Sequence, residues 1–385
     1  MHNIVVLGFG LASAPIVRQT MRTIVLPSDK YKLYLVTPSS TYHWPIAMPR
    51  AVLPGQIPDE KVLVPIESSF AEYPTEKFSL VMGTADVLDP AAKTVVVARN
   101  DGTSETINYD TLIVATGSSA RDDVPWKALG TTEKTTERLR AVQAEIEKAK
   151  TIVVAGGGMT GIETAGELGF EYSQHGTKEV YYVFSETLPM PSLKENVRKA
   201  AQSELDKLKV KSLPCTTVSS ATKKGDEYII ELRTADGSPK TITAQAYLPA
   251  LGLTPNTAFA PAPMRAADGR LKQTATLQAP DHPEILIVGD AGNLQFSTAA
   301  YAYEQALHVV KHLGEYLSTG TMAPHQVSDK IQAAVTIGRS RGTGQVGSFK
   351  LFSILVWWLK GRFLGTDVSP LLPAGKRTSM AVLEK

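Results

Sequence analysis

Two glycine-rich turns, each preceded by a short apolar run, constrain this sequence more than any other feature. The first turn is Gly8–Ser13 and follows Ile4–Leu7, and the second is Gly156–Gly161 and follows Ile152–Ala155. A strand that enters such a turn and leaves it as a helix points backbone N–H groups and a helix N-terminus at a pyrophosphate. One such turn is weak evidence, but two predict a chain that holds two dinucleotides. That layout is typical of enzymes that pass electrons between a nicotinamide and a flavin.

The size and charge of the chain narrow the class of protein. It has 385 residues, more than one hydrophobic core usually organises, so two or three domains are expected. Its net charge of +2 gives no electrostatic footprint for nucleic acid, and no such partner is expected. The start of the sequence reads as a strand rather than a signal peptide, His2 excludes N-myristoylation, and no apolar run reaches the length of a membrane span. We therefore expect a cytoplasmic protein, with peripheral attachment to a membrane or lipid-droplet surface left open.

The chain contains a single cysteine, Cys215. Many flavoproteins with two dinucleotide sites use a redox pair of thiols, which this chain cannot form, so disulfide reduction within one chain is excluded. We interpret Cys215 as a buried or incidental residue rather than a catalytic thiol. A chain without a disulfide of its own fits a reducing compartment.

The order of predicted elements divides the chain into three parts. Residues 1–120 and 253–320 are expected to form a discontinuous flavin-binding domain, 121–252 a nicotinamide-binding domain that repeats its plan, and 321–385 a C-terminal region. The pattern predicts an irregular segment at 41–50, helices at about 13–21, 135–150, 161–172, 195–207 and 297–317, and strands at 32–37, 94–98, 106–109, 109–117, 180–184, 246–252 and 285–288.

Several further motifs resemble the two-dinucleotide-domain flavoproteins, whose arrangement is glutathione-reductase-like. Besides the two turns, this resemblance is carried by Ala115-Thr116-Gly117, Gly289-Asp290 and the lack of a thiol pair. Other pieces are similar to the ferroptosis-suppressor and AMID branch of AIF-like flavoproteins, namely His43…Pro49-Arg50, Gly161–Glu167, Leu253–Thr257, Gly338–Gly347 and Leu359–Arg362. The resemblance covers essentially the whole chain. It implies an α/β fold with two Rossmann-like domains, for FAD and NAD(P)H, and a small C-terminal α+β region.

The resemblance also implies a set of flavin-binding residues. Those expected at FAD are Gly8, Gly10 and Ser13 at the pyrophosphate, Arg50 adding charge to the phosphates, Thr116 and Gly117 where backbone passes close, and Asp290 at the ribityl hydroxyls. The helix that begins near Ser297 would stabilise negative charge on the flavin. One departure concerns the second strand, which ends in Leu35–Ser40 and lacks the acid that usually binds the adenosine ribose.

The second turn carries a complete nicotinamide fingerprint in Gly156, Gly158 and Gly161. Glu186, after the following strand, is expected to accept from a ribose hydroxyl, and Ser185 would tolerate a 2′-phosphate. Neither is an arginine that would select NADP, so NADH is favoured and NADPH stays open.

Glu163 and Lys360 are the candidate catalytic residues. In similar proteins a glutamate at the position of Glu163 lies near the flavin, together with a lysine from the tail at the position of Lys360. A lysine near the flavin can deliver a proton. Two plainer interpretations stay open. Glu163 also suits the first turn of any helix, and Lys360 also suits solvent or a lipid headgroup.

The tail 349–362 is apolar with basic ends and paired tryptophans. It is too short to span a bilayer and suits a helix on a membrane surface that admits quinones, or equally a buried helix or a dimer contact.

His43, His308 and His312 show no metal-ligand spacing, so no metal is expected.

These observations favour an FAD-dependent oxidoreductase that takes hydride from NADH or NADPH and gives two electrons to a quinone-like acceptor. A tailoring flavoenzyme that acts on a specialised small molecule keeps the same fold and changes the acceptor. An AIF-like signalling or nucleic-acid-binding flavoprotein is the alternative from another class. A homodimer is compatible with all three.

Overall fold

The computed structural model describes residues 1–328, 330–379 and 381–383. Within them the largest sheet, here the N-terminal sheet, has the strand order β18-β19-β8-β1-β2-β5-β6-β7, and the neighbours from β19 to β5 run parallel. Its strands are β1 (His2–Leu7), β2 (Tyr31–Thr37), β5 (Phe78–Asp89), β6 (Thr94–Arg99), β7 (Ser104–Asn108), β8 (Thr111–Val114), β18 (Gln278–Ala279) and β19 (His282–Ile287).

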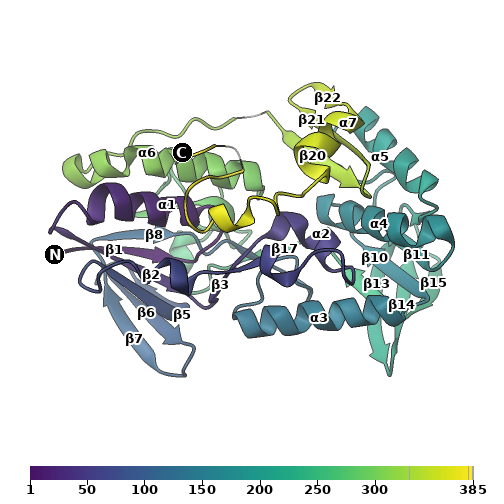
Figure 1. Cartoon of the computed structure of the whole chain (residues 1–385), viewed down its shortest axis with the longest axis horizontal. Coiled ribbons are helices and arrows are strands. Elements are labelled where there is room, and N and C mark those ends of the chain that lie inside the picture. Colours follow the sequence, from purple (N-terminus) through teal and green to yellow (C-terminus); the bar gives the residue numbers. More distant parts are fainter. Residues whose placement is uncertain (329, 380, 384–385) are drawn as a thin grey trace.

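Strand β1 is a continuous apolar run because both faces of the sheet are covered. Ile4 and Val6 pack in a cluster with helix α1 (Ser13–Thr20) and helix α6 (Ala299–Thr319). Val5 and Leu7 point the other way, into a second cluster that includes Phe259. Figure 1 shows α1 and α6 side by side over one face of the sheet. Buried parallel strands are expected to show this uninterrupted pattern.

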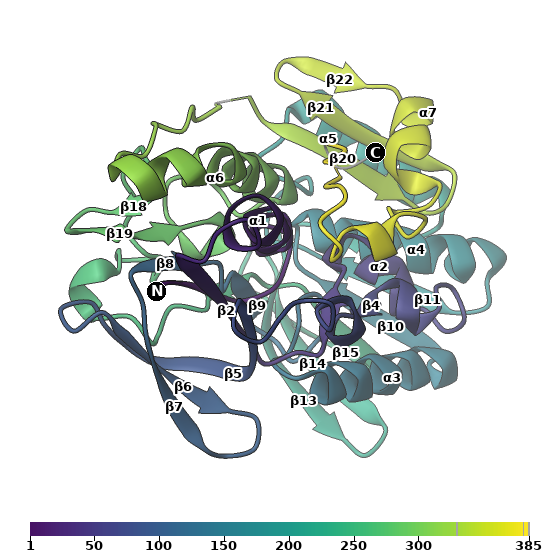
Figure 2. The same cartoon turned by 60° about the vertical axis from the view of Figure 1, so that its left-hand side comes forward.

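A second parallel sheet, here the central sheet, repeats the plan with the order β12-β11-β10-β16. Its strands are β10 (Thr151–Ala155), β11 (Glu179–Val183), β12 (Lys211–Leu213) and β16 (Ala246–Pro249). The elements that cover it are the helices α3 (Thr132–Lys148), α4 (Met159–Glu171) and α5 (Glu195–Lys207), and an antiparallel sheet of β13 (Thr217–Lys224), β14 (Glu227–Arg233) and β15 (Pro239–Ala244). The two repeats lie beside each other (Figure 2).

Short paired segments connect the two repeats. The chain leaves the first repeat through β9 (Ser118–Ala120) and returns through β17 (Leu253–Pro255), and these strands pair antiparallel. Beside them, β3 (Thr41–His43) pairs with β4 (Leu63–Pro65) and leads into α2 (Met48–Ala51).

The C-terminal region begins as an antiparallel sheet against the central repeat. It consists of β20 (Gln332–Ile337), β21 (Arg341–Val346) and β22 (Phe349–Leu351), followed by α7 (Ser353–Val356) and a helical turn, Trp357–Gly361. Strand β20 packs on α4, where a Cβ on Gly166 would lie 2.9 Å from the Ile337 Cα. This contact places the following turn next to α4.

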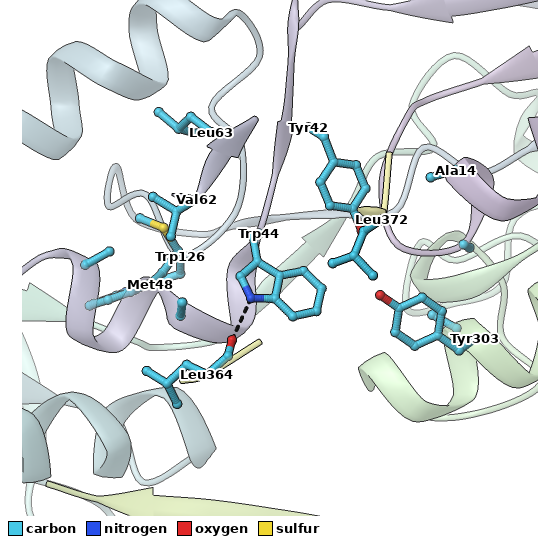
Figure 3. Packing of buried hydrophobic residues seen from close by; sticks show 14 of the residues in the cluster. Ala14, Tyr42, Trp44, Met48, Val62, Leu63, Trp126, Tyr303, Leu364 and Leu372 are labelled. Atoms are coloured by element: carbon cyan, nitrogen blue, oxygen red, sulfur yellow. Dashed lines mark hydrogen bonds between the residues drawn. The ribbon is translucent and has the colours of Figure 1, made fainter. Parts of the chain in front are cut away.

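Residues 364–379, here called the strap, then cross back to the first repeat. The Trp44 indole Nε1 donates to the Leu364 carbonyl at 2.7 Å, as Figure 3 shows. On α1, Arg18 Nε donates to the Pro373 carbonyl at 2.9 Å and Gln19 Nε2 to the Gly375 carbonyl at 3.1 Å. Leu364 and Leu372 belong to the same buried cluster as Trp44, Tyr42 and Tyr303. The strap is therefore a packed part of the fold.

Most predicted elements are confirmed to within a few residues, and α5 agrees at both ends. Two expectations are wrong. Residues 41–50 form β3, a 3₁₀ turn (Pro45–Ala47) and part of α2, because β4 supplies a distant pairing partner. The tail 349–362 is not one helix, since Phe349–Leu351 pairs with Gly344–Val346 before the helical turns begin.

Both glycine turns bring strand backbones close together. Gly8 has φ +92°, and a Cβ there would lie 2.6 Å from the Ala115 carbonyl oxygen. Gly156 has φ +123°, and its Cβ would lie 2.3 Å from the Ala250 carbonyl oxygen. No other residue type fits either position.

We expect Gly161→Ala to destabilise the fold, because the new Cβ would lie 2.0 Å from the Gly156 carbonyl oxygen, which cannot move away without distorting the turn. Overpacking of this kind costs about 1–3 kcal/mol. Gly158→Ala is the matched control, since its Cβ meets no atom within 4 Å. Urea unfolding should show a lower midpoint for the first variant only, and equal midpoints would contradict the expectation.

Candidate active site

A cavity of about 1240 Å³ is lined by residues of both glycine turns. Gly8 and Gly10 line it from the first turn and Gly158 from the second. Sites for drug-sized ligands usually measure about 300–1,000 Å³, so this cavity has room for more than one such ligand. The two turns therefore serve one shared space.

At the first turn the backbone is open to the cavity. A Cβ on Gly10 would meet no atom within 4 Å, so a ligand can approach the main chain there. Ser13, which the sequence places at the pyrophosphate, is buried and does not line the cavity. Its hydroxyl accepts from the Gly10 N–H at 2.8 Å, so it shapes the turn from behind.

Thr116, Gly117 and Asp290 all line the cavity. Thr116 Oγ1 donates to the Asn256 carbonyl at 2.6 Å, which ties the first repeat to the returning chain. Asp290 Oδ2 accepts from the Ser118 hydroxyl at 2.7 Å and from Lys127 Nζ at 3.0 Å. These donors hold a carboxylate at the end of β19, facing the cavity.

Lys127 was missed at the sequence level, although it lines the cavity beside Asp290. It lies in the irregular segment after β9, where no periodicity or motif distinguishes one lysine from another. Only the fold brings it next to a residue 163 positions away.

In the second turn, Gly158, Met159 and Thr160 line the cavity, whereas Gly156 and Gly161 lie behind them and set the shape of the turn. Like Gly10, Gly158 leaves open space at its Cβ position. Glu186 is exposed just after β11 and does not line the cavity, and its carbonyl accepts from the Cys215 N–H at 3.0 Å.

The structure brings the two candidate catalytic residues into contact. Lys360 Nζ lies 2.5 Å from Glu163 Oε1, and both side chains line the cavity. The same carboxylate oxygen accepts from the Thr336 N–H at 3.0 Å and from the Thr336 hydroxyl at 3.2 Å. Lys360 Nζ also donates to the Ala334 carbonyl at 3.1 Å. Strand β20 thus fixes both members of the ion pair.

Arg50 does not fit its expected role at the phosphates. Its guanidinium is buried and makes a bidentate pair with Glu167, from Nε at 2.9 Å and from Nη2 at 2.7 Å. Nη2 also donates to the Gly361 carbonyl at 3.2 Å. Arg50 does not line the cavity, because it is held by Glu167, which lies one turn after Glu163 on α4.

His43 lines the cavity and is buried, with Nε2 3.2 Å from the Pro125 carbonyl. Burial lowers its pKa to about 4, and the charge of Lys127 acts in the same direction, so the ring is neutral at pH 7. The rings of His308 and His312 on α6 lie in contact at a tilt of 42°, with centroids 4.7 Å apart. The part of the chain that the structure describes contains no group of three His, Cys, Asp or Glu side chains placed for a metal ion.

The sequence profile of the pyridine nucleotide-disulphide oxidoreductases matches residues 2–306, most of the chain. The chain belongs to this family. Its members include enzymes named for a disulfide, but this oxidoreductase has only Cys215, which does not line the cavity.

Relatives of this oxidoreductase include "Oxidoreductase ptaL" of Pestalotiopsis fici, which is 32% identical over 92% of this chain and 94% of its own. "Ferroptosis suppressor protein 1" of Taeniopygia guttata is 27% identical over 78% and 81%. The structure of NDH2 from Plasmodium falciparum in complex with NADH aligns with a TM-score of 0.76 at 13% identity, over 97% of this chain and 96% of its own. The ferroptosis-suppressor protein is thus a distant relative of this oxidoreductase.

These findings confirm the α/β flavoprotein fold and make FAD and NAD(P)H the cofactors of this oxidoreductase. The cavity fits them, since each glycine turn offers it an open stretch of backbone.

We expect Arg50→Met to destabilise the protein by about 3–5 kcal/mol, because it leaves the Glu167 carboxylate buried without its partner. The double variant Arg50→Met with Glu167→Leu removes both charges and should recover most of that loss. Urea unfolding of the three proteins gives the comparison. If Arg50→Met unfolds like the wild type but loses FAD, the expectation is contradicted and Arg50 is assigned to binding the FAD phosphates.

Proposed function

We propose that this chain is an FAD-dependent oxidoreductase that takes hydride from NAD(P)H and passes two electrons to a quinone-like small molecule. The shared cavity is the observation that carries the proposal, since both glycine turns line it. In this assignment residues 1–120 and 253–320 bind FAD, 121–252 bind NAD(P)H and 321–385 complete the site. Bound FAD supplies a ring that accepts hydride and releases electrons singly or in pairs.

The residues around the cavity orient the reactants rather than forming bonds with them. We assign the first turn and Asp290 to the flavin and Gly158–Thr160 to the nicotinamide dinucleotide, because all of them line the cavity except the buried part of the first turn. Holding two reactants in register removes much of the entropic barrier. Thr298 caps α6 by accepting from the Tyr301 N–H at 3.2 Å, and Thr298 itself lines the cavity. The positive end of this long helix therefore favours negative charge in the cavity.

Glu163 and Lys360 supply the proton chemistry in this proposal. The carboxylate holds the Lys360 ammonium at the cavity, where it is a donor to an acceptor oxygen. Three donors on Glu163 Oε1 hold the carboxylate in place, so the lysine has one preferred position.

An apolar rim on the cavity fits a quinone-like ring. Trp358, Leu359 and Phe363 line the cavity and are also exposed, with 64% of Trp358 accessible. The neighbouring tail exposes Phe349, Phe352 and Ile354 by 74–79%, with basic residues at Lys350 and Arg362. Such a surface suits peripheral contact with a lipid interface.

We therefore include peripheral membrane contact through 349–362 in the proposal. Among the described residues, no helix has the length and apolar character needed to cross a bilayer. Co-sedimentation with vesicles would support this contact, whereas self-association of the pure protein would assign the same face to a homodimer.

A tailoring reaction on a specialised small molecule is the second candidate. Two fungal proteins named only as oxidoreductases match 92% and 94% of this chain, against 78% for the ferroptosis-suppressor relative, and their names give no quinone as the acceptor. Both candidates share the first half-reaction and differ only in the acceptor.

The purified protein is expected to be yellow, to bleach anaerobically with NADH, and to regain its colour when a short-chain quinone is added. Stopped-flow absorbance measures both steps, and NADPH in place of NADH gives the coenzyme preference. A protein that takes up no FAD would refute the proposal. Bleaching without recovery by quinones would transfer the assignment to a specialised acceptor.

We expect Lys360→Met to slow quinone-dependent reoxidation by about 10²-fold or more, the usual contribution of a positioned acid. Bleaching by NADH should be much less affected, because the lysine is assigned to the acceptor. Lys350→Met is the matched control from the same tail, and its side chain lies outside the cavity lining. Equal reoxidation rates for the two variants would remove Lys360 from the mechanism.

A further inference from the structure

Several residues of the strap line the cavity, and Arg377 is the one cation among them. Arg377 lines the cavity together with Gly10, Ala12 and Asp290, although it lies far from them in the sequence. The strap reaches this point along α1, where Gly375 is so close that a Cβ on it would lie 2.2 Å from the Arg18 Cβ. The contact fixes the chain two residues before Arg377.

Elements on the other side of Arg377 show where in the cavity it lies. Arg377 lines the cavity together with Ala302 of α6, and Leu372, earlier in the strap, belongs to the same buried cluster as Tyr303 on that helix. A Cβ on Gly289 would lie 3.5 Å from the Ala12 Cβ and 3.6 Å from the Ala302 Cβ. The start of α1, the end of β19 and the first turns of α6 therefore converge here.

The charges of the cavity leave Arg377 without an acidic partner. Lys127, Lys360 and Arg377 are the lysines and arginines of the described residues that line it. Lys127 pairs with Asp290 and Lys360 with Glu163. The third acid of the lining, Asp367, is exposed, and neither it nor Arg377 forms an ion pair within the described ranges. Its Nε makes only a long contact, 3.3 Å, with the carbonyl of the adjacent Thr378. An uncompensated cation beside a glycine turn and a helix N-terminus favours an anion.

We propose that Arg377 binds the pyrophosphate of FAD and that the strap thereby holds the cofactor in the cavity. This inference rests on the proposed function, which assigns FAD to the first glycine turn. Arg377 supplies the phosphate-binding charge that the sequence suggested for Arg50. The strap remains in place through Trp44, Arg18 and Gln19, whose hydrogen bonds to it do not involve Arg377.

The test compares FAD retention in Arg377→Ala, Arg377→Lys and the matched control Lys376→Ala, whose side chain is exposed. Release of FAD from each holoenzyme is followed by the rise in free-flavin fluorescence on dilution at several salt concentrations. Loss of a charge-assisted hydrogen bond should weaken FAD binding by about tenfold to a hundredfold in the alanine variant. The lysine variant should fall between the two, since it keeps the charge and loses the planar fork.

A second measurement separates a binding role from a folding role. Circular dichroism and thermal unfolding after FAD removal should be the same for Arg377→Ala and Lys376→Ala. Wild-type FAD release should accelerate with salt, and that dependence should be weaker in the alanine variant. FAD retention by Arg377→Ala equal to that of the control, or an equal loss in both, overturns the inference and leaves the proposed function intact. Failure of the wild type to bind FAD overturns the proposed function itself.

Discussion

Two buried carboxylates one turn apart on α4 hold the parts of this molecule in register. Glu163 forms an ion pair with Lys360 of the tail, and Glu167 forms an ion pair with Arg50 on α2 in the first repeat. Helix α4 also begins at the second glycine turn, so one element meets the nicotinamide site, the tail and the other repeat. A buried ion pair adds little net stability, but it strongly penalises any arrangement that leaves a charge unpaired. The relative placement of the two repeats and the tail follows from that penalty.

The same reasoning accounts for the electrostatics of the cavity. Its lysines are neutralised by carboxylates that are themselves fixed by hydroxyl or backbone donors. His43 adds no charge at neutral pH because burial keeps its pKa low. Among the described residues that line the cavity, two charged side chains remain without an ion pair, the exposed Asp367 and the cation Arg377. In such an environment a single cation has a large effect on where an anionic ligand lies.

The sequence predicts well what depends on local patterns. The glycine turns, the apolar strands and the helix at 195–207 follow from residues within a few positions of one another, and the structure confirms them. Long-range pairing was the source of each miss. Arg50 was placed at a ligand because its partner lies 117 residues away, and the tail appeared helical because its strand partner could not be read from its own residues. Arg377 has no motif, and only packing of the strap against α1 brings it to the cavity.

The strap also sets an order of events in the making of this protein. The first glycine turn is translated before both dinucleotide-binding repeats are complete, whereas the strap follows both of them in the chain. A nascent chain can build the N-terminal strands but cannot enclose anything between them until residues 364–379 have emerged and packed on Trp44 and Arg18. With Arg377 in its proposed role, retention of the flavin depends on the strap, and chains truncated before residue 364 should fold in part but lose the cofactor.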